Sequence, residues 1–556
     1  MSLQLKIALV AVVCVSLFFN LYARDISPPC INADEAAFSY NAWSIAKTGK
    51  DEYGRQLPIR LQSYGDWKLP LLSYVTVPFV GVFGLNEQNA RLPNTVVAAV
   101  FPIVLFFLIR ELFGKTRVAL LGSLLISSSL GMHIVGRHLH EGYLAAFLIT
   151  LAFLFYVRLL RKLTLRDALL FLTVVLVSLF TYHSSRIFAI GFFLAALVQF
   201  LPRRTRQTSG FVAGFFGVLL IFAATDLIIA PARVANLIFF NSPAYVAGIQ
   251  EMRDEGSPRV FYNKLMPGVK DVFSENLKYF SAQFIAQNGD QNFRFGHPGM
   301  PPITVLEYLL FFVGLYYLFK NREKHRFLIS FLLFISPLAA SLSWVGLSLT
   351  RSLFLLTPFL IVTAYGVFSL LDSYKKHPKT ALGIFVFLIG MWALLQYYSW
   401  NFYINHYPKR AIVIRSWGCG YKELASYISK NYDRYDRFFI TRQNGQPYMH
   451  LLFFLQYPPE KYHSQAKLGP LNEYGFGTVE RFDKFVFDVI RPEKGENVVL
   501  IGFPDDFTSM NRQLPNVRWV QKIKLRTEEI FWIYDNAVLN VETEFKDPPP
   551  GWTETL

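Results

Sequence analysis

Two adjacent carboxylates, Asp34 and Glu35, follow closely on the first apolar run of the chain, which extends from Ile7 to Tyr22. Acidic side chains beside a membrane contribute little to packing, whereas a carboxylate near a hydroxyl group can act as a general base. A first run of this length could also be a cleaved signal peptide. No clear small-residue cleavage site follows it, so we interpret the run as a retained helix.

Cationic side chains lie near the ends of later apolar runs. Arginine binds phosphate through its planar fork and lysine as a compact charge, and such cations stabilise the charge that develops on a departing phosphate. The chain thus offers a general base, cations that could bind phosphate, and apolar surroundings that could bind a lipid tail. Together they suggest transfer of a group from a lipid-linked phosphate. The candidates that join the acidic pair are Lys68, Arg91, Arg137, Glu141, Arg186 and Arg351.

Composition indicates which elements must position these residues. The chain has 556 residues, and 53% of them are hydrophobic. Apolar runs of roughly 20 residues, the length that spans a hydrocarbon core, recur between Lys6 and Trp400. Helices satisfy their own backbone hydrogen bonds in lipid, so we expect a polytopic α-helical membrane protein. The net charge of +16 lies mainly in short loops between the runs, where topology explains it, so we expect no nucleic-acid partner.

One apolar segment, 69–85, decides the topology. It contains Pro70, Pro78, Gly81 and Gly84, which weaken a straight helix. If it does not cross, the basic clusters of the later loops fall inside, as the positive-inside rule favours. We therefore predict that it lies along the outer interface and that eleven spans cross the membrane, at 5–23, 93–109, 118–135, 143–158, 167–183, 187–201, 210–230, 303–319, 327–345, 352–371 and 380–399.

This topology places the N-terminus in the cytoplasm of an inner-membrane protein and divides the chain into two domains. Residues 1–400 form the membrane domain, whose long outer loops are 24–92, with interfacial helices, and 231–302. Residues 401–556 form a small extracytoplasmic α/β domain. Its predicted elements are strands at 437–441 and 497–502 and a helix at 420–432.

The order of motifs resembles that of the GT-C glycosyltransferases, in particular the protein O-mannosyltransferases and the lipid A aminoarabinose transferase. Those families have an acidic pair after the first helix, a Lys-Pro-Pro-Leu-like motif before an interfacial helix that ends in Gly, and Arg-Leu-Pro at the start of the next span. This chain has Asp34-Glu35, Lys68-Leu69-Pro70-Leu71, Gly84 and Arg91-Leu92-Pro93, with Leu69 in place of a proline. The segments 136–141 and 350–353 resemble later family motifs more loosely.

The resemblance implies a role for each candidate residue. Asp34 would be the general base that deprotonates the acceptor, and Glu35 would orient a substrate. Glu141 would contact the sugar or the acceptor. The residues that would contact the donor phosphate are Lys68, Arg91, Arg137, Arg186 and Arg351.

Several candidates also have a purely structural interpretation. Asp34 could cap an interfacial helix that begins near Ala36, and Glu35 could be a first-turn charge favoured by the helix dipole. Lys68 could be an interfacial anchor. Arg137 and Glu141 are four residues apart and could form an ion pair.

The prediction is a GT-C-like inverting transferase that moves a sugar from a polyprenyl-phosphate donor to a glycan, lipid or protein acceptor at the outer face of the membrane. The alternatives are a lipid-linked sugar flippase or transporter, and a glycan polymerase or ligase that uses a pyrophosphate-linked donor. Membrane lipids are the other expected partners. No motif names a metal site, and no cofactor is expected beyond the lipid-phosphate co-substrate, although Asp34, Glu35 and Glu141 could hold a divalent cation.

Overall fold

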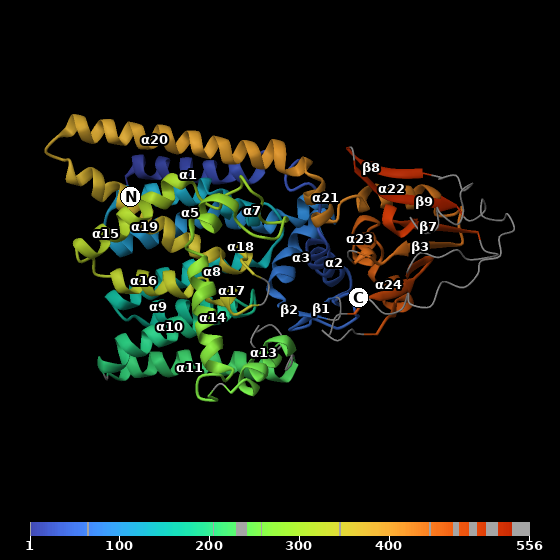
Figure 1. Ribbon diagram of the computed structural model, residues 1–556, viewed down its shortest axis with the longest axis horizontal. Coiled ribbons are helices and arrows are strands. Elements are labelled where there is room, and N and C mark those ends of the chain that lie inside the picture. Colours follow the sequence, from blue (N-terminus) through green and yellow to red (C-terminus); the bar gives the residue numbers. More distant parts are fainter. Residues whose placement is uncertain are drawn as a thin grey trace. The chain divides into compact units, whose positions relative to one another are not determined.

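The computed structural model describes residues 2–535 except 64–65, 204, 230–241, 257, 344–345, 444–445, 471–476, 489–496, 508–520 and 527. The chain divides into two compact units, Met1–Trp417 and Gly418–Leu556. The first unit is almost wholly helical, and the second contains a mixed β-sheet (Figure 1).

Seven helical segments in the described part of the first unit are long and apolar enough to cross a membrane by length and composition. The helices that form them are α1 (Leu3–Leu21), α4 and α5 (Glu87–Ala90 and Leu92–Phe113), α8 (Glu141–Arg161), α10 (Ser185–Phe200), α11 (Arg206–Ile229), α18 and α19 (Leu349–Ser352 and Leu356–Ser373) and α20 (Pro378–Asn401). The chain is therefore an integral membrane protein.

The remaining expected spans are helical but differ from a straight crossing helix. Segment 118–135 is a broken pair, α6 (Thr116–Ser128) and α7 (Leu130–Gly136), bent by 52°, which raises the number of candidate spans to eight if the pair counts as one. Ser129 lies at the break, where its side chain caps α7. The other three expected spans contain helices shorter than 18 residues: α9 (Leu165–Leu179), α15 (Val305–Lys320) and α16 (Arg326–Ile335).

Helices α2 (Ala33–Thr48) and α3 (Leu71–Phe83) and strands β1 (Leu61–Ser63) and β2 (Asp66–Lys68) lie together at one end of this unit (Figure 1). The segment 69–85, predicted not to cross, contains the 13-residue helix α3 (Leu71–Phe83) with Pro78 inside it. The antiparallel strands β1 (Leu61–Ser63) and β2 (Asp66–Lys68) precede it, with Leu61 opposite Lys68. The other short helices of the unit are α2 (Ala33–Thr48), α13 (Pro243–Asp254), α14 (Leu265–Lys278), α17 (Leu338–Ser341) and α21 (Ala411–Trp417).

The second unit has α/β architecture, as its sequence pattern predicted. Its seven-stranded sheet has the order β4-β5-β6-β3-β7-β9-β8, and β3 pairs in parallel with both β6 and β7. Phe439, Leu500 and Tyr534 belong to its core. The strands are β3 (Arg437–Thr441), β4 (Lys467–Leu468), β5 (Val479–Phe482), β6 (Phe485–Asp488), β7 (Val498–Gly502), β8 (Gln521–Leu525) and β9 (Glu528–Asp535), and the helices are α22 (Tyr421–Asn431), α23 (Pro447–Phe454) and α24 (Pro459–Gln465).

Candidate active site

The acidic pair lies in the first turn of α2. The side-chain oxygen of Asn32 accepts hydrogen bonds from the backbone N–H groups of Asp34 (2.9 Å) and Glu35 (3.0 Å), and the Glu35 carboxylate accepts one from the Asn32 N–H (3.3 Å). This reciprocal arrangement is a capping box. Asn32 therefore caps the helix, which begins at Ala33 rather than near Ala36, and the Asp34 side chain is not used as the cap.

The Asp34 carboxylate faces two cations. Its oxygens lie 2.8 Å from the Lys68 Nζ and 3.6 Å from an Arg294 guanidinium nitrogen, and 48% of the side chain is exposed. The positive charge of Lys68, with a further contribution from Arg294, holds the pKa of Asp34 well below its usual range. Asp34 is thus ionised and accessible.

The β1–β2 hairpin and α2 position Lys68. The lysine is the last residue of β2, immediately before the turn into α3, and its Nζ lies 5.0 Å from the centre of the Phe38 ring. Only 12% of the Lys68 side chain is exposed. Its ammonium group is consequently directed at Asp34 rather than into bulk solvent.

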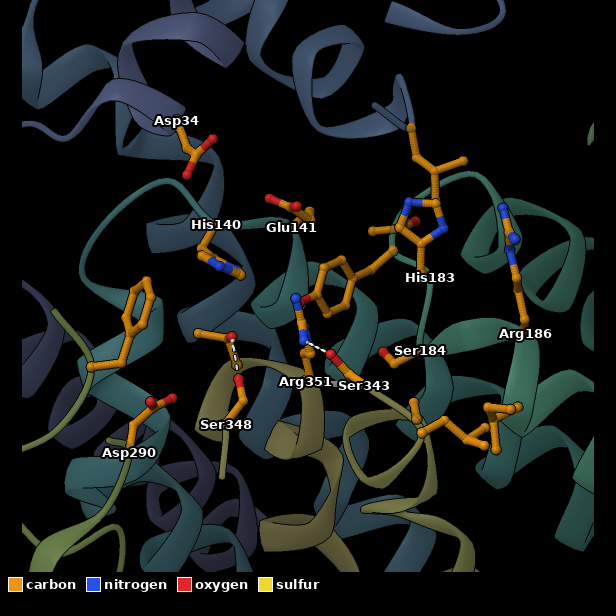
Figure 2. Close-up of a pocket in the computed structure, with 18 of the residues that line it drawn as sticks. Asp34, His140, Glu141, His183, Ser184, Arg186, Asp290, Ser343, Ser348 and Arg351 are labelled. Atoms are coloured by element: carbon orange, nitrogen blue, oxygen red, sulfur yellow. Dashed lines mark hydrogen bonds between the residues drawn. The ribbon is translucent and has the colours of Figure 1, made fainter. Parts of the chain in front are cut away.

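Asp34 and Lys68 line a cavity of about 850 Å³. Figure 2 shows side chains from separate helices and loops that border this space. Leu69, Ile187 and Leu342 supply part of its apolar wall. The acidic, basic and histidine side chains of the lining are Asp34, Lys68, His140, Glu141, His183, Arg186, Asp290, Arg294 and Arg351.

The cations of the cavity differ in how far carboxylates neutralise them. Arg186 lies 2.9 Å from the Asp226 carboxylate, which Arg60 also contacts at 2.9 Å, and Arg294 is near Asp34. Arg351 donates a hydrogen bond to the Ser343 hydroxyl and has no carboxylate at ion-pair distance among the described residues. Arg351 is therefore well suited to bind an added anion.

Glu141 is the first residue of α8, and His140 caps that helix by accepting the Gly142 N–H at its Nδ1 (2.9 Å). Within the described part of the chain, the Glu141 carboxylate has neither a hydrogen-bond nor an ion-pair partner, and the expected alternative of an Arg137–Glu141 pair is not formed. The cavity thus contains a second carboxylate that is available to a ligand.

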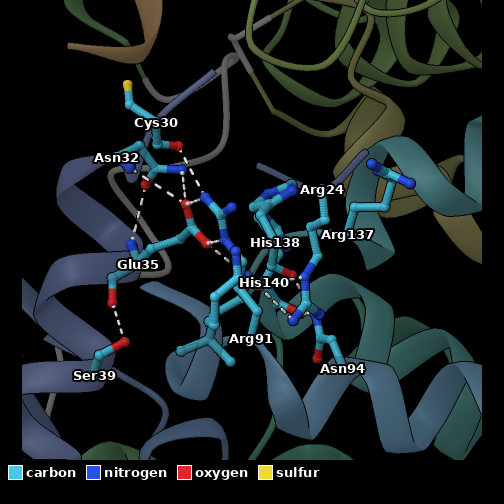
Figure 3. A network of polar contacts seen from close by, with 12 residues as sticks. Arg24, Cys30, Asn32, Glu35, Ser39, Arg91, Asn94, Arg137, His138 and His140 are labelled. Atoms are coloured by element: carbon cyan, nitrogen blue, oxygen red, sulfur yellow. Dashed lines mark hydrogen bonds and ion pairs between the residues drawn. The ribbon is translucent and has the colours of Figure 1, made fainter. Parts of the chain in front are cut away.

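Glu35, Arg91 and Arg137 do not line the cavity. Glu35 and Arg91 form a buried network beside it (Figure 3), whereas Arg137 has separate partners. Glu35 is fully buried and accepts from Arg91 at both oxygens (3.0 and 3.2 Å) and from the Leu139 N–H (2.9 Å). Arg91 also donates to the Cys30 carbonyl (2.9 Å). Since Leu139 precedes His140, this network connects the start of α2 to the start of α8.

Arg137 is fully buried and secures the chain after α1. Its guanidinium donates to the carbonyls of Phe19, Tyr22 (2.7 Å) and Ser27 (2.8 and 3.0 Å). Carbonyls that are not used within a helix need such donors when they are buried. Arg137 therefore fixes the backbone that leads from the end of α1 to the acidic pair.

Sequence reasoning missed Arg294 and Asp290, which lie in a loop without regular periodicity. Asp290 is 6% exposed and accepts from the Asn292 N–H (2.8 Å) and the Leu349 N–H (2.6 Å). Burial raises its pKa to about 6. The only sequence signal was the position of both residues in the long predicted outer loop 231–302.

The described residues contain no group of three or more His, Cys, Asp or Glu side chains placed to hold a metal ion. The Asp34, Glu35 and Glu141 carboxylates that could share a cation do not converge: Glu35 is engaged with Arg91, away from the cavity lining. The geometry defines a cavity whose lining includes Lys68, Arg186, Arg294 and Arg351 and the accessible carboxylates of Asp34 and Glu141.

Comparisons with known proteins identify this architecture. Residues 68–227 match the family model of the dolichyl-phosphate-mannose-protein mannosyltransferases. The fold is similar to that of ArnT from Cupriavidus metallidurans in the apo state, with a TM-score of 0.56 and 13% identity over 97% of this chain and 99% of that one. For ArnT bound to undecaprenyl phosphate the TM-score is 0.55, with 12% identity over 96% and 98%.

The archaeal oligosaccharyltransferase AglB from Archaeoglobus fulgidus is a weaker match, with a TM-score of 0.44 and 13% identity over 82% of this chain and 64% of that one. No curated protein matches the chain by sequence. The chain therefore has the fold of ArnT, and the part of it at 68–227 matches the mannosyltransferase family model.

Proposed function

We propose that the protein is an inverting glycosyltransferase that moves a sugar from a polyprenyl-phosphate donor to an acceptor at the outer face of the membrane, with its N-terminus in the cytoplasm. The observation that carries the proposal is the cavity in which the accessible Asp34 carboxylate lies beside Lys68 and Arg294 and shares the lining with Arg351. ArnT, whose fold is similar, has been solved with undecaprenyl phosphate bound.

The proposed reaction is a single displacement at the anomeric carbon. The acceptor oxygen attacks that carbon, its proton passes to Asp34, and the bond from the carbon to the phosphate oxygen breaks. The electron pair of that bond leaves on the lipid phosphate, whose negative charge therefore increases. Cations placed where this charge develops stabilise the transition state.

Lys68 connects the two halves of this chemistry. At rest its ammonium lies 2.8 Å from Asp34 and makes the carboxylate a weak base. A donor phosphate that engages Lys68 shares this cation, so the proton affinity of Asp34 rises when the donor is bound. Asp34 would thus become a stronger base when the donor is bound.

Arg351 is proposed as the main phosphate contact, with Lys68 and Arg294 beside it. Arg186 contributes a weaker field, because the Asp226 carboxylate neutralises part of its charge. Glu141, which has no partner among the described residues, is proposed to accept a hydroxyl hydrogen bond from the sugar or the acceptor. His183 also borders the cavity and is a further candidate sugar contact.

Glu35, Arg91 and Arg137 are proposed to act as positioning residues. Glu35 and Arg91 connect the starts of α2 and α8, which carry Asp34 and Glu141. Arg137 holds the connection between α1 and α2. Loss of any of them would move both carboxylates together.

The test is mass spectrometry of purified protein in lipid nanodiscs, incubated with a panel of polyprenyl-phosphate sugars and acceptor lipids, glycans and peptides. We expect a new glycosylated product with one donor. In Asp34→Asn, product formation should fall by about 10²- to 10⁴-fold, the usual contribution of a general base, while donor binding persists. Asp372→Asn, which alters an exposed acid outside the cavity lining, is the matched control.

Wild-type turnover in Asp34→Asn would remove Asp34 as the base. Failure of every donor to give a product, together with movement of a labelled lipid-linked sugar across proteoliposome membranes, would replace the proposal by the transport alternative. A product formed only from a pyrophosphate-linked donor would favour the polymerase or ligase alternative.

A further inference from the structure

Helix α14 has an exposed apolar face that no described element covers. Val269, Phe273 and Leu277 recur at intervals of four residues and are 59%, 51% and 52% exposed. Residues with this spacing form one stripe along a helix. Such a stripe needs an apolar partner.

The rest of the helix surface is divided into two further sectors. On one side of the stripe lies the protein-facing sector, which includes Gly268 and Asn276, both buried. On the other side lie Lys270, Ser274 and Lys278, all exposed to solvent. The order of protein, apolar surface and charged surface around one helix is that of a helix at a membrane–water boundary.

The position of α14 in the fold supports the same partner. The helix lies in the chain between the end of α11 and the start of α15, and its ribbon runs across the direction of α11 and α20 in Figure 1. The end of α16 lies beside α14, because the Asn276 side chain donates to the Phe334 carbonyl (3.0 Å). The α15 side chain of Tyr308 donates to the Phe280 carbonyl (3.1 Å), just after α14. Lysines beside the apolar stripe can reach anionic headgroups while their stems stay in the apolar layer.

The protein-facing sector of α14 contacts the segment that leads to Arg351. The Asn276 side chain donates to the Phe334 carbonyl (3.0 Å) and accepts from the Ser341 hydroxyl (3.2 Å). Directly after the helix, the Tyr279 hydroxyl accepts from the Ser348 N–H (2.9 Å). Ser343, which accepts from Arg351, lies between these attachment points.

We propose that α14 is an interfacial helix whose Val269–Phe273–Leu277 face enters the headgroup–hydrocarbon boundary of the bilayer, and that this contact holds the Arg351 segment in place at the cavity. The proposed link between α14 and Arg351 rests on the proposed function, because that function assigns Arg351 to the donor phosphate. The proposed location of α14 at the bilayer boundary does not rest on it.

The location is tested by site-directed nitroxide labels in nanodiscs of phosphatidylglycerol and phosphatidylethanolamine. Cys14, a free and exposed cysteine, is first replaced in a Cys14→Ser background. Phe273→Cys is compared with its neighbour Ser274→Cys. We expect the label at 273 to collide mainly with molecular oxygen, which concentrates in hydrocarbon, and the label at 274 mainly with a water-soluble nickel chelate.

Equal nickel accessibility at the two positions would overturn the inference, because the helix would then stand in water. Protection of the label at 273 from both reagents would also overturn it, because a protein segment would then cover the face. Neither result depends on glycosyl transfer, so failure here is distinct from failure of the proposed function.

The connection to the cavity is tested by binding of undecaprenyl phosphate to the nanodisc-embedded protein. Phe273→Asp should weaken binding by at least about fivefold, the lower range of coupling between linked sites, whereas Ser274→Asp should leave it unchanged. Phe273→Leu should bind as wild type, because the face needs only apolar surface. Unchanged binding in Phe273→Asp would overturn the connection between α14 and Arg351.

Discussion

At the scale of residues, two arginines of the same cavity should respond differently to the same substitution. Arg351→Gln removes a cation that has no carboxylate partner among the described residues, so we expect donor affinity to fall by about tenfold to a hundredfold, as for loss of a charged hydrogen bond, with little change in Tm. Arg186→Gln leaves Asp226 with one guanidinium fewer. This variant should therefore lower Tm more than Arg351→Gln does and lower donor affinity less. Donor titration and thermal unfolding of both variants check this contrast, and equal profiles would contradict it.

Asp290 gives the cavity a pH-dependent stability. Burial raises its pKa from 3.8 to about 6, so the folded protein holds this proton more tightly than the unfolded chain does. Stability from this group is therefore fully present below the unfolded value and is lost as pH rises through about 6, by on the order of 3 kcal/mol at most.

The variant Asp290→Asn cannot titrate at this position. The difference in Tm between this variant and wild type should accordingly shift in favour of the variant as pH rises from 3.8 to about 6, and should then stay constant. Parallel Tm profiles across this window would show that Asp290 does not titrate there.

At the scale of elements, the cap of α2 should matter more for activity than for stability. Asn32→Ala removes two side-chain-to-backbone hydrogen bonds and should cost about 1 kcal/mol, but the frayed turn carries Asp34, so we expect turnover to fall by more than tenfold. Thr164→Ala removes the cap of α9 and serves as the control, with a similar loss of stability and near-normal turnover. Similar turnover in both variants would show that the cap has no special role.

The elements also show where sequence reasoning succeeds. The prolines and the charge count predicted that 69–85 does not cross, and the length of α3, 13 residues, agrees with that; its position at the outer interface stays a prediction. A hydropathy pattern depends only on composition, however. It therefore does not detect the bend at Ser129 that divides segment 118–135 into α6 and α7. It also overestimated the helix at 327–345, where α16 ends at Ile335 and the short α17 follows, whereas 303–319 agrees with α15 within two residues at either end.

At the scale of the whole molecule, the motif order predicted the fold, while the cavity depends on contacts between distant segments. Asp34, Lys68 and Glu141 are separated widely in sequence, and the topology brings them to the lining of one cavity. The partner of Glu35 at Arg91 and that of Asp34 at Arg294 could not be predicted, because ion pairs across long separations follow from tertiary packing. The roles of all these residues stay proposals.

The capping box has one more consequence, for insertions and deletions. Successive residues on a helix point about 100° apart, so α2 directs Asp34 toward the cavity and Glu35 toward the buried Arg91. If the helix began one residue later, Glu35 would take the direction toward the cavity and Asp34 would turn out of it. If the helix began one residue earlier, the shorter Asp34 would point toward Arg91 and Glu35 would turn away from it. The identity of each acid is thus tied to the residue number at which the helix starts.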